Sequence, residues 1–246
     1  MSWFGRSGQD LARQLDLPRV EARPVVDSTM DVAHALAADG APAGTLVLAE
    51  AQQAGRGRVG KRWQSESGAG LWLTLVERPR DASALGVLSL RIGLRLAPVL
   101  ERWTVGSVRL KWPNDLFVGA GKLAGVLVET RWRGTAPDWV AIGLGINLRA
   151  PAGPFAGAAL RDADPGEVLA EVIPALRAAA FAEGPLSDAE VADFASRDLA
   201  LGQRIAEPAD GRVRGIAPSG ELLVETAAGV TPVRSGSLIF APTEGL

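Results

Sequence analysis

The sequence predicts an α/β protein that ends in a small β-rich domain. Between residues 27 and 197, segments with apolar residues at helical spacing alternate with short apolar runs that are typical of strands. From Leu201 onward, five short β-rich runs alternate with turn residues, a pattern that suggests a small barrel. We therefore expect a larger domain over residues 1–198 and a smaller one over residues 199–246.

The elements follow from local signals along the chain. A helix is expected over residues 27–39, because Asp27-Ser28-Thr29 supplies N-cap chemistry and Gly40 a stop. A second is expected over residues 83–102, with Arg91, Arg95 and Arg102 on the side away from the apolar positions. The remaining helices are expected over residues 166–183 and 187–197, and strands over residues 45–50, 71–77, 107–112, 116–118, 123–130 and 138–148.

Composition excludes several classes of site. Of the 246 residues, 47% are hydrophobic and 22% charged, the balance of a globular protein that buries a core. The net charge of −2 gives no general attraction to nucleic acid or to an anionic membrane, so an anion site needs a local cluster of cations. The absence of cysteine excludes disulfides, thiolate metal sites and cysteine nucleophiles. His34 is the only histidine, and we expect it to be a satisfied surface or boundary residue rather than a metal ligand or triad member.

Neither a targeting peptide nor a membrane-spanning segment is expected. The first ten residues mix Trp3 and Phe4 with charged residues and lack the apolar run of a signal peptide. The apolar stretch over residues 83–100 is interrupted by Arg91 and Arg95. We therefore expect a cytoplasmic protein without a membrane partner.

The segment over residues 55–63, GRGRVGKRW, formally matches two phosphate-binding patterns, GxGxxG and GxxxxGK. Neither structural context is expected here. Position 62 is arginine instead of the Ser or Thr that would hold magnesium, and a loop into a strand follows instead of a helix. We therefore reject both the Rossmann and the Walker interpretation.

The chemistry of this segment still indicates an anion site. Arg56, Arg58, Lys61 and Arg62 place four cations within seven residues, with no acid among them. The three glycines allow the loop to fold around a ligand, and Trp63 offers an aromatic face to a base. A polyanion is the ligand that this composition favours. A solvated basic loop is the alternative.

Lysine is rare in this chain and occurs only at positions 61, 111 and 122. Lysine is a compact point charge and arginine a planar fork, so the two are not interchangeable at a reacting centre. Lys111 precedes the turn Pro113-Asn114-Asp115 at a strand end, and Lys122 opens a strand. Because functional groups often lie at such positions, the pattern favours a shared anion site. A plain hairpin turn is the alternative for residues 113–115.

Glycines within apolar strands indicate a close approach to the backbone. Gly121 and Gly125 flank one strand start, and Gly143 and Gly145 lie in another apolar strand. Close packing of the protein's own backbone explains Gly121 and Gly125 equally well.

Together these segments resemble the biotin–protein ligase family. The matching motifs are DST at 27–29, QQAGRGRVGKRW at 52–63, KWPND at 111–115, GKLAGVLVE at 121–129 and GLGIN at 143–147, and the resemblance covers about residues 24–242. It implies the fold of class II aminoacyl-tRNA synthetases and lipoate ligases, a mixed and mostly antiparallel sheet with helices on one face, followed by an SH3-like barrel. Met30 stands where the family usually has asparagine, and Lys61 where arginine is common.

The resemblance also implies roles for individual residues. The implied catalytic residues are Arg56, Lys111, Asp115 and Lys122. The implied biotin site consists of Ser28, Thr29, Met30, Gln52, Arg56, Gly57, Arg58, Lys122, Gly125 and Gly145. The implied ATP site consists of Arg58, Lys61, Trp63, Lys111, Asn114 and Asn147, with Trp63 packed on adenine.

The implied reaction uses ATP and Mg²⁺ to convert biotin to biotinyl-5′-AMP, and then transfers biotin to a lysine of a biotin carboxyl carrier domain. Asp115 is a candidate Mg²⁺ ligand and a candidate to orient or deprotonate the acceptor lysine, and a plain turn residue is the alternative. A homodimer is possible in such a family. Only about 25 residues precede the Ser-Thr motif, too few for the DNA-binding domain of bifunctional members, so we expect no specific DNA binding.

Three other functions compete with this interpretation. A lipoate–protein ligase would use the same scaffold with a different acid, but the arginine-rich loop and KWPND argue against it. A nucleic-acid-binding protein would explain the cations at 55–62, but the C-terminal part offers only Phe240 as a stacking platform. A member that binds biotin without catalysis is the third, and the retained lysines argue against it.

Overall fold

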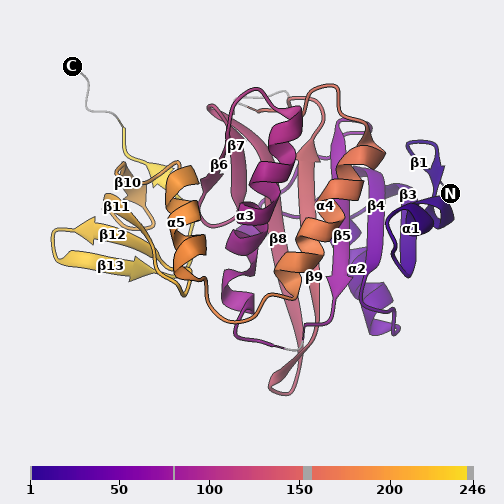
Figure 1. Ribbon diagram of the computed structural model, residues 1–246, viewed down its shortest axis with the longest axis horizontal. Helices are drawn as coiled ribbons and strands as arrows, with labels where there is room; N and C mark the ends of the chain where they lie inside the picture. The colour runs from indigo at the N-terminus through magenta and orange to yellow at the C-terminus, as the bar shows by residue number, and fades with distance from the viewer. Residues whose placement is uncertain (1, 80, 152–156, 243–246) are drawn as a thin grey trace.

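A seven-stranded mixed sheet forms the centre of the protein (Figure 1). The structure is a computed structural model that describes residues 2–79, 81–151 and 157–242. The strand order is β3-β4-β5-β9-β8-β7-β6, and every neighbouring pair is antiparallel except β3 and β4. The strands are β3 (Arg19–Val26), β4 (Thr45–Gln52), β5 (Gly70–Glu77), β6 (Val108–Lys111), β7 (Asp115–Val118), β8 (Gly121–Arg133) and β9 (Ala136–Asn147).

Helices cover both faces of this sheet. Helices α3 and α4 lie side by side across one face (Figure 1), whereas α2 packs on the other face against β4, β5 and β9. The prediction of helices on one face was therefore wrong for α2. The reason lies in β4, where Leu46 and Leu48 join the α3–α4 core while Val47 packs with Ala33 and Ala37 of α2. A strand buried on both faces is a continuous apolar run, and such a run does not indicate which face a helix covers. The helices are α1 (Gly8–Gln14), α2 (Thr29–Ala38), α3 (Leu88–Leu100), α4 (Pro165–Ala180) and α5 (Asp188–Arg197), with 3₁₀ turns η1 (Arg58–Gly60), η2 (Leu85–Val87) and η3 (Glu101–Trp103).

The expected elements are confirmed to within a few residues at their ends. The Ser28 hydroxyl accepts the Met30 N–H at 3.3 Å and so caps α2, as its position before the helix predicted. One helix differs from its predicted pattern, because Arg91 of α3 is buried instead of facing solvent. Its guanidinium donates to Glu190 of α5 at 2.7 Å and to the backbone carbonyl of Pro185 at 2.9 Å.

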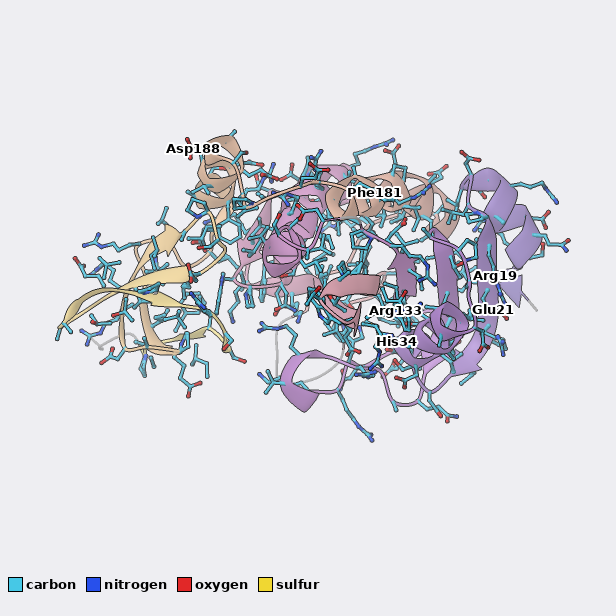
Figure 2. All side chains as sticks on the ribbon, turned by 90° about the horizontal axis from the view of Figure 1, so that it is seen from below. Arg19, Glu21, His34, Arg133, Phe181 and Asp188 are labelled. Carbon is cyan, nitrogen blue, oxygen red and sulfur yellow. The ribbon has the colours of Figure 1, made fainter. Side chains whose placement is uncertain are left out.

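The N-terminal elements had no clear sequence signal. Strand β3 is an edge strand in which charged residues such as Arg19 and Glu21 alternate with apolar ones, and both lie at the outer edge of the sheet in Figure 2. The first elements, β1 (Ser2–Trp3), β2 (Arg6–Ser7) and α1, are short. None of the helices in the described parts of the chain is long and apolar enough to cross a membrane.

The C-terminal part forms a separate five-stranded antiparallel sheet beside α5 (Figure 1). Five strands were predicted here, and five are found. Their order, β13-β12-β11-β10-β14, leaves β13 and β14 as edges, so within the described residues the sheet is open and the barrel is not confirmed. The strands are β10 (Arg204–Glu207), β11 (Gly211–Ile216), β12 (Leu222–Thr226), β13 (Gly229–Val233) and β14 (Ile239–Phe240).

Direct hydrogen bonds join β6 and the residue after it to segments that flank the strands of the C-terminal sheet. The Arg109 guanidinium in β6 donates to the backbone carbonyl of Asp198 at 2.7 Å, and the Leu199 N–H donates to the carbonyl of Leu110 at 2.9 Å. The Trp112 indole N–H donates to the carbonyl of Gly220 at 3.0 Å. The strand that leads into the KWPND turn is therefore anchored to the C-terminal sheet.

Candidate active site

A cavity of about 510 Å³ collects the predicted site residues. Its walls come from the start of α2, the loop over residues 55–63, the β6–β7 turn, strands β8 and β9, and residues 237–239 of the C-terminal part. Every residue predicted for catalysis, biotin binding or ATP binding lines this cavity except Asn147. Five motifs that span 117 positions of sequence, from Ser28 to Gly145, are thus brought into one site.

One end of the cavity carries neutral hydrogen-bonding groups in fixed positions. Gln52 Oε1 accepts the backbone N–H of Thr29 at 2.9 Å and its hydroxyl at 3.1 Å. The Thr74 hydroxyl donates to Thr29 Oγ1 at 2.9 Å, and Gln52 Nε2 donates to Ser65 Oγ at 2.8 Å. Thr74 and Ser65 were not predicted, because single polar residues in a strand and a loop carry no sequence signal. This end suits an uncharged group that exchanges hydrogen bonds with the protein.

Met30 forms an apolar wall next to this network. Its side chain is 2% exposed, and its terminal methyl lies 2.8 Å from the point where a Cβ on Gly143 would stand. The close approach that was predicted at the glycines of this strand is therefore confirmed at Gly143, and the approaching group is Met30.

Trp63 covers the two other glycines of the site. A Cβ on Gly145 would lie 2.6 Å from the indole of Trp63, and one on Gly125 would lie 2.8 Å from its ring. The ring also packs edge-to-face against Trp72 at 6.4 Å. Within the described residues, the buried indole N–H has no hydrogen-bond partner. The glycines of β8 and β9 thus create a flat bed on which an aromatic ring lies.

The opposite end of the cavity is cationic. Lys122 Nζ lies 2.7 Å from Asp115 Oδ1 and 4.6 Å from the centre of the Trp63 ring. Burial lowers the pKa of Lys111; Lys122 and Lys61 push it in the same direction, and Asp115 opposes them. Burial also lowers the pKa of Arg58, again against the attraction of Asp115. Cations that are crowded and partly desolvated bind an added anion more strongly than solvated ones do.

The loop over residues 55–63 is a closed hairpin in this structure. The Gly57 N–H donates to the carbonyl of Lys61 at 2.7 Å, and the Trp63 N–H donates to that of Gly55 at 2.8 Å. The loop continues into strand β5 without a helix, which confirms the rejection of both phosphate-loop interpretations. At its tip Val59 is 80% exposed and has a φ of 54°, a conformation that is strained for a β-branched residue.

Two predicted residues have hydrogen bonds that were not foreseen. Arg56 binds two carboxylates, Asp31 and Glu129, at 2.7 and 2.6 Å. Asn147 is buried, and its side-chain amide donates to the backbone carbonyls of Lys122 at 3.0 Å and Ala158 at 3.1 Å. Asn147 therefore holds the start of the strand that carries Lys122, and its contact with ATP stays a prediction.

The C-terminal part contributes one wall of the site. Arg58 donates to the backbone carbonyl of Gly236 at 3.4 Å, and Lys61 Nζ to the hydroxyl of Ser237 at 3.3 Å. The ring of Phe240 lies 5.5 Å from Lys111 Nζ. No local pattern could have revealed these contacts, because they join residues more than 100 positions apart.

Comparison with known proteins places this geometry in a family. The description "Biotin/lipoate A/B protein ligase family" matches residues 22–147. The chain is also 35% identical over 239 residues to the biotin–[acetyl-CoA-carboxylase] ligase of Paracoccus denitrificans, across 87% of this chain and 97% of that protein. The chain belongs to the biotin/lipoate A/B protein ligase family.

Other members of the biotin/lipoate A/B protein ligase family are similar in sequence or in structure. The bifunctional ligase/repressor BirA of Escherichia coli is 40% identical over 147 residues, which are 58% of this chain and only 44% of that protein. The chain thus matches less than half the length of this curated relative. The biotin protein ligase of Aquifex aeolicus in complex with biotin and ATP superposes with a TM-score of 0.73 at 26% identity, over 91% of this chain and 99% of that chain.

Proposed function

We propose that this protein is a biotin–protein ligase, which activates biotin with ATP to biotinyl-5′-AMP and transfers it to a lysine of a biotin carboxyl carrier domain. The observation that carries the proposal is the polarity of the cavity. A neutral hydrogen-bonding end at Thr29 and Gln52 and a cationic end at Lys111 and Lys122 share one space, with the Trp63 ring on the glycines of β8 and β9. Biotin has an uncharged polar ring system at one end and a carboxylate at the other, and ATP is a polyanion.

The cationic end addresses the main difficulty of the first step. The biotin carboxylate must attack the α-phosphate, so two anions approach each other while charge develops at phosphorus. Preorganised donors that are aimed at this charge lower the barrier. We assign this role to Arg56 and Lys122, with Lys111, Arg58 and Lys61 on the phosphates. Removal of one such donor costs about 3–4 kcal/mol in the barrier in comparable sites.

The remaining predicted residues divide between the two substrates. Ser28, Thr29, Met30 and Gln52 enclose the ring system of biotin, while Trp63 offers its face to adenine. In this structure the Lys61 backbone and the Trp63 ring occupy the space over Gly57 and over Gly125 and Gly145, so the ligand chain approaches these glycines when the loop over residues 55–63 moves. Asn114 holds Arg58 at 3.3 Å and, together with Asn147, supports the nucleotide end.

Mg²⁺ enters this scheme with ATP. Within the described ranges, no group of three or more acidic or histidine side chains is placed to hold a metal ion. Asp115 is the one carboxylate among the described residues that line the cavity, and it is paired with Lys122. This donor set fits an ion that is held mainly by phosphates and water, as Mg²⁺ commonly is, with Asp115 as one possible protein ligand.

Asp115 has two candidate roles in the reaction. Its ion pair positions Lys122 for the first half-reaction, and its carboxylate could receive a proton from the acceptor lysine in the second. Measuring the two half-reactions of Asp115→Ala separately distinguishes them. Loss confined to transfer supports the base, and loss in adenylate formation supports the positioning of Lys122.

We further propose that residues 1–198 form the catalytic domain and residues 199–246 an SH3-like domain. The separate five-stranded sheet supports the division. Its contacts to Arg58 and Lys61 suggest that the second domain completes the nucleotide end. A homodimer is compatible with this arrangement, and its test is the mass of the purified protein in solution.

The transfer of biotin to protein tests the proposed function. Purified protein, ATP, Mg²⁺ and biotin are incubated with a biotin carboxyl carrier domain, and the intact mass of the domain is measured. We expect one biotin per domain, none on a domain whose acceptor lysine is replaced by arginine, and a rate that falls about 10²–10³-fold for Lys122→Ala. Modification with lipoate but not with biotin would instead indicate a lipoate ligase.

A further inference from the structure

Arg56 is held by two carboxylates that come from different elements. Its Nη1 lies 2.7 Å from Asp31 Oδ1 in the first turn of α2, and its Nη2 lies 2.6 Å from Glu129 Oε1 in β8. The arginine side chain is 41% exposed, so this is a rim contact rather than a buried core pair. Two separate carboxylates on one guanidinium fix its orientation more strictly than one would.

Glu129 is itself oriented by a chain of hydrogen bonds. Its second oxygen lies 3.0 Å from His34 Nε2, and the Trp139 indole nitrogen lies 3.0 Å from His34 Nδ1. An indole N–H can only donate, so Nδ1 must accept. The ring is therefore neutral, with its proton on Nε2, and it donates that proton to Glu129. His34, which lies on the α2 side of the sheet opposite Phe181 (Figure 2), is satisfied as predicted and has a defined orienting role.

The far end of this chain is rigid. Trp139 is 7% exposed, and the guanidinium groups of Arg78 and Arg131 lie 5.8 Å and 6.0 Å from the centre of its ring. Arg78 in turn donates to the backbone carbonyl of Ala37 at the end of α2, at 3.0 Å. The network that ends on Arg56 is thus anchored in the packing of α2 against the sheet.

The groups that contact Arg56 and Glu129 directly leave a negative excess at the rim of the cavity. Arg56 contributes one positive charge, Asp31 and Glu129 contribute two negative charges, and His34 is neutral. An anionic ligand that approaches Arg56 meets this excess, and it competes with two carboxylates for the same N–H donors. The other cations that line the cavity, such as Lys122 and Arg58, lie outside this network.

We propose that Asp31 and Glu129, the second oriented by His34, form a carboxylate latch on Arg56. The latch neutralises Arg56 in the empty site and yields when the carboxylate of biotin takes over its N–H donors. Glu129, Asp31 and His34 are positioning residues that act through Arg56. The inference rests on the proposed function, in which Arg56 contacts the anionic end of biotin.

Calorimetric titration with biotin and with its uncharged primary amide tests the latch. Glu129→Gln and Asp31→Asn keep the shape of each side chain and remove the charge. Each is expected to tighten binding of biotin, by about tenfold for Glu129→Gln, which equals about 1.4 kcal/mol. Binding of the amide is expected to stay unchanged. Glu171→Gln removes a carboxylate of α4 that pairs with Arg102, outside this network, and it should change neither affinity.

A double-mutant cycle with Arg56→Ala separates the latch from a general loss of negative charge. The gain from Glu129→Gln should vanish in the Arg56→Ala background, because no guanidinium is left to release. Weaker binding of biotin by Glu129→Gln, or a gain that persists without Arg56, would overturn the proposal. A protein of normal thermal stability that binds neither biotin nor its amide would overturn the proposed function.

A second measurement, of the tautomer of His34, tests the latch in the absence of any ligand. His34 is the only histidine of the chain, so the ¹⁵N-labelled ring gives one set of imidazole signals in nuclear magnetic resonance. We expect the Nε2–H tautomer in the wild type and a shifted Nε2 signal in Glu129→Gln. The Nδ1–H tautomer, or a ring signal that Glu129→Gln leaves unchanged, would contradict the latch even if biotin binds as proposed.

Discussion

Trp63 shows how single residues shape this site. Its ring lies on Gly125 and Gly145, where any side chain would collide with it, and Lys122 lies over its face. The conformational freedom of glycine is not what matters here, because both glycines lie in regular strands and only their missing Cβ is used. The position of the Trp63 ring therefore requires glycine at both 125 and 145.

Replacement of Gly145 by alanine tests this requirement. The added methyl would lie 2.6 Å from the indole, so we expect Trp63 to be pushed off the sheet at a cost of about 1–3 kcal/mol, typical of overpacking. Binding of ATP should weaken at least tenfold, with altered tryptophan fluorescence. Gly86→Ala is the control, because a Cβ there meets nothing within 4 Å. Equal affinity for ATP in both variants would contradict the proposed role of Trp63.

At the residue scale, the sequence predicted the residues that line the cavity, but not the residues that hold them in place. Gly-Arg loops, isolated lysines and glycines in strands have chemical signatures that can be recognised one motif at a time. Asp31 and Glu129 have none, because an acid in a helix or strand is usually a solvated surface residue. Their role emerges only when α2 and β8 place them on either side of Arg56.

At the scale of elements, helix α5 is attached to the core through one buried arginine. Arg91 of α3 is 2% exposed and pairs with Glu190, which also completes the capping box of α5 with Ser187. The hydrogen bonds from Arg91, followed by those from Ser187, lower the pKa of Glu190 to about 2. The same pair therefore joins two helices and caps one of them.

Glu190→Gln is expected to lower the free energy of unfolding by about 3 kcal/mol at neutral pH, from the linkage between pKa and stability. Because the pKa of Glu190 is lower in the folded state, its contribution is full above about pH 5 and is lost as the pH falls toward 2. Denaturant unfolding across this range is the measurement. Glu171→Gln, which breaks an exposed pair with Arg102, should cost less than about 1 kcal/mol. Similar losses for both variants would show that burial of Arg91 is unimportant.

The elements themselves were largely predictable where their patterns were long. Helix α4 and strands β5 and β9 have uninterrupted periodic or apolar runs, and they match the prediction closely. Strand β3 has alternating charges and a proline, so tertiary pairing with β4 decides its conformation. The prediction that Arg91 faces solvent was wrong, because Glu190 of α5, much later in the sequence, supplies a partner for it.

At the scale of the whole molecule, Asp198 lies at the junction between the two sheets. It is 2% exposed, one carboxylate oxygen accepts the Ala200 N–H at 2.8 Å, and the other has no partner within the described residues. Burial raises the pKa of Asp198 to about 6, although the Ala200 N–H and Arg109 oppose the shift. The junction that positions the C-terminal wall of the site therefore contains a carboxyl group that resists ionisation.

Asp198 predicts a loss of stability as the pH rises. The pKa of Asp198 is higher in the folded state, so its contribution to the free energy of unfolding is full below about pH 4. This contribution, roughly 3 kcal/mol in total, is lost as the pH rises through about 6. Asp198→Asn should remove this component from the pH profile of the free energy of unfolding. A variant whose profile between pH 4 and 7 is identical to that of the wild type would contradict the assignment.

The organisation of the whole molecule was the least accessible from sequence. The change of composition near residue 200 predicted a second β unit, but not that residues 236–240 contact the loop at Arg58 and Lys61. Nor could the apolar runs indicate that α2 covers the second face of the sheet. Both features arise from contacts between distant segments.

The central claim is that one cavity binds biotin and ATP together and forms biotinyl-5′-AMP, with release of pyrophosphate. Its most direct test is the exchange of labelled pyrophosphate into ATP by the purified protein with Mg²⁺, in the presence of biotin, lipoate or octanoate. We predict exchange with biotin, none with lipoate or octanoate, and a loss of about 10²–10³-fold for Lys122→Ala. Exchange with lipoate alone would move the protein to the other branch of its family. No exchange with any acid, from folded protein that still binds biotin, would contradict the proposed mechanism.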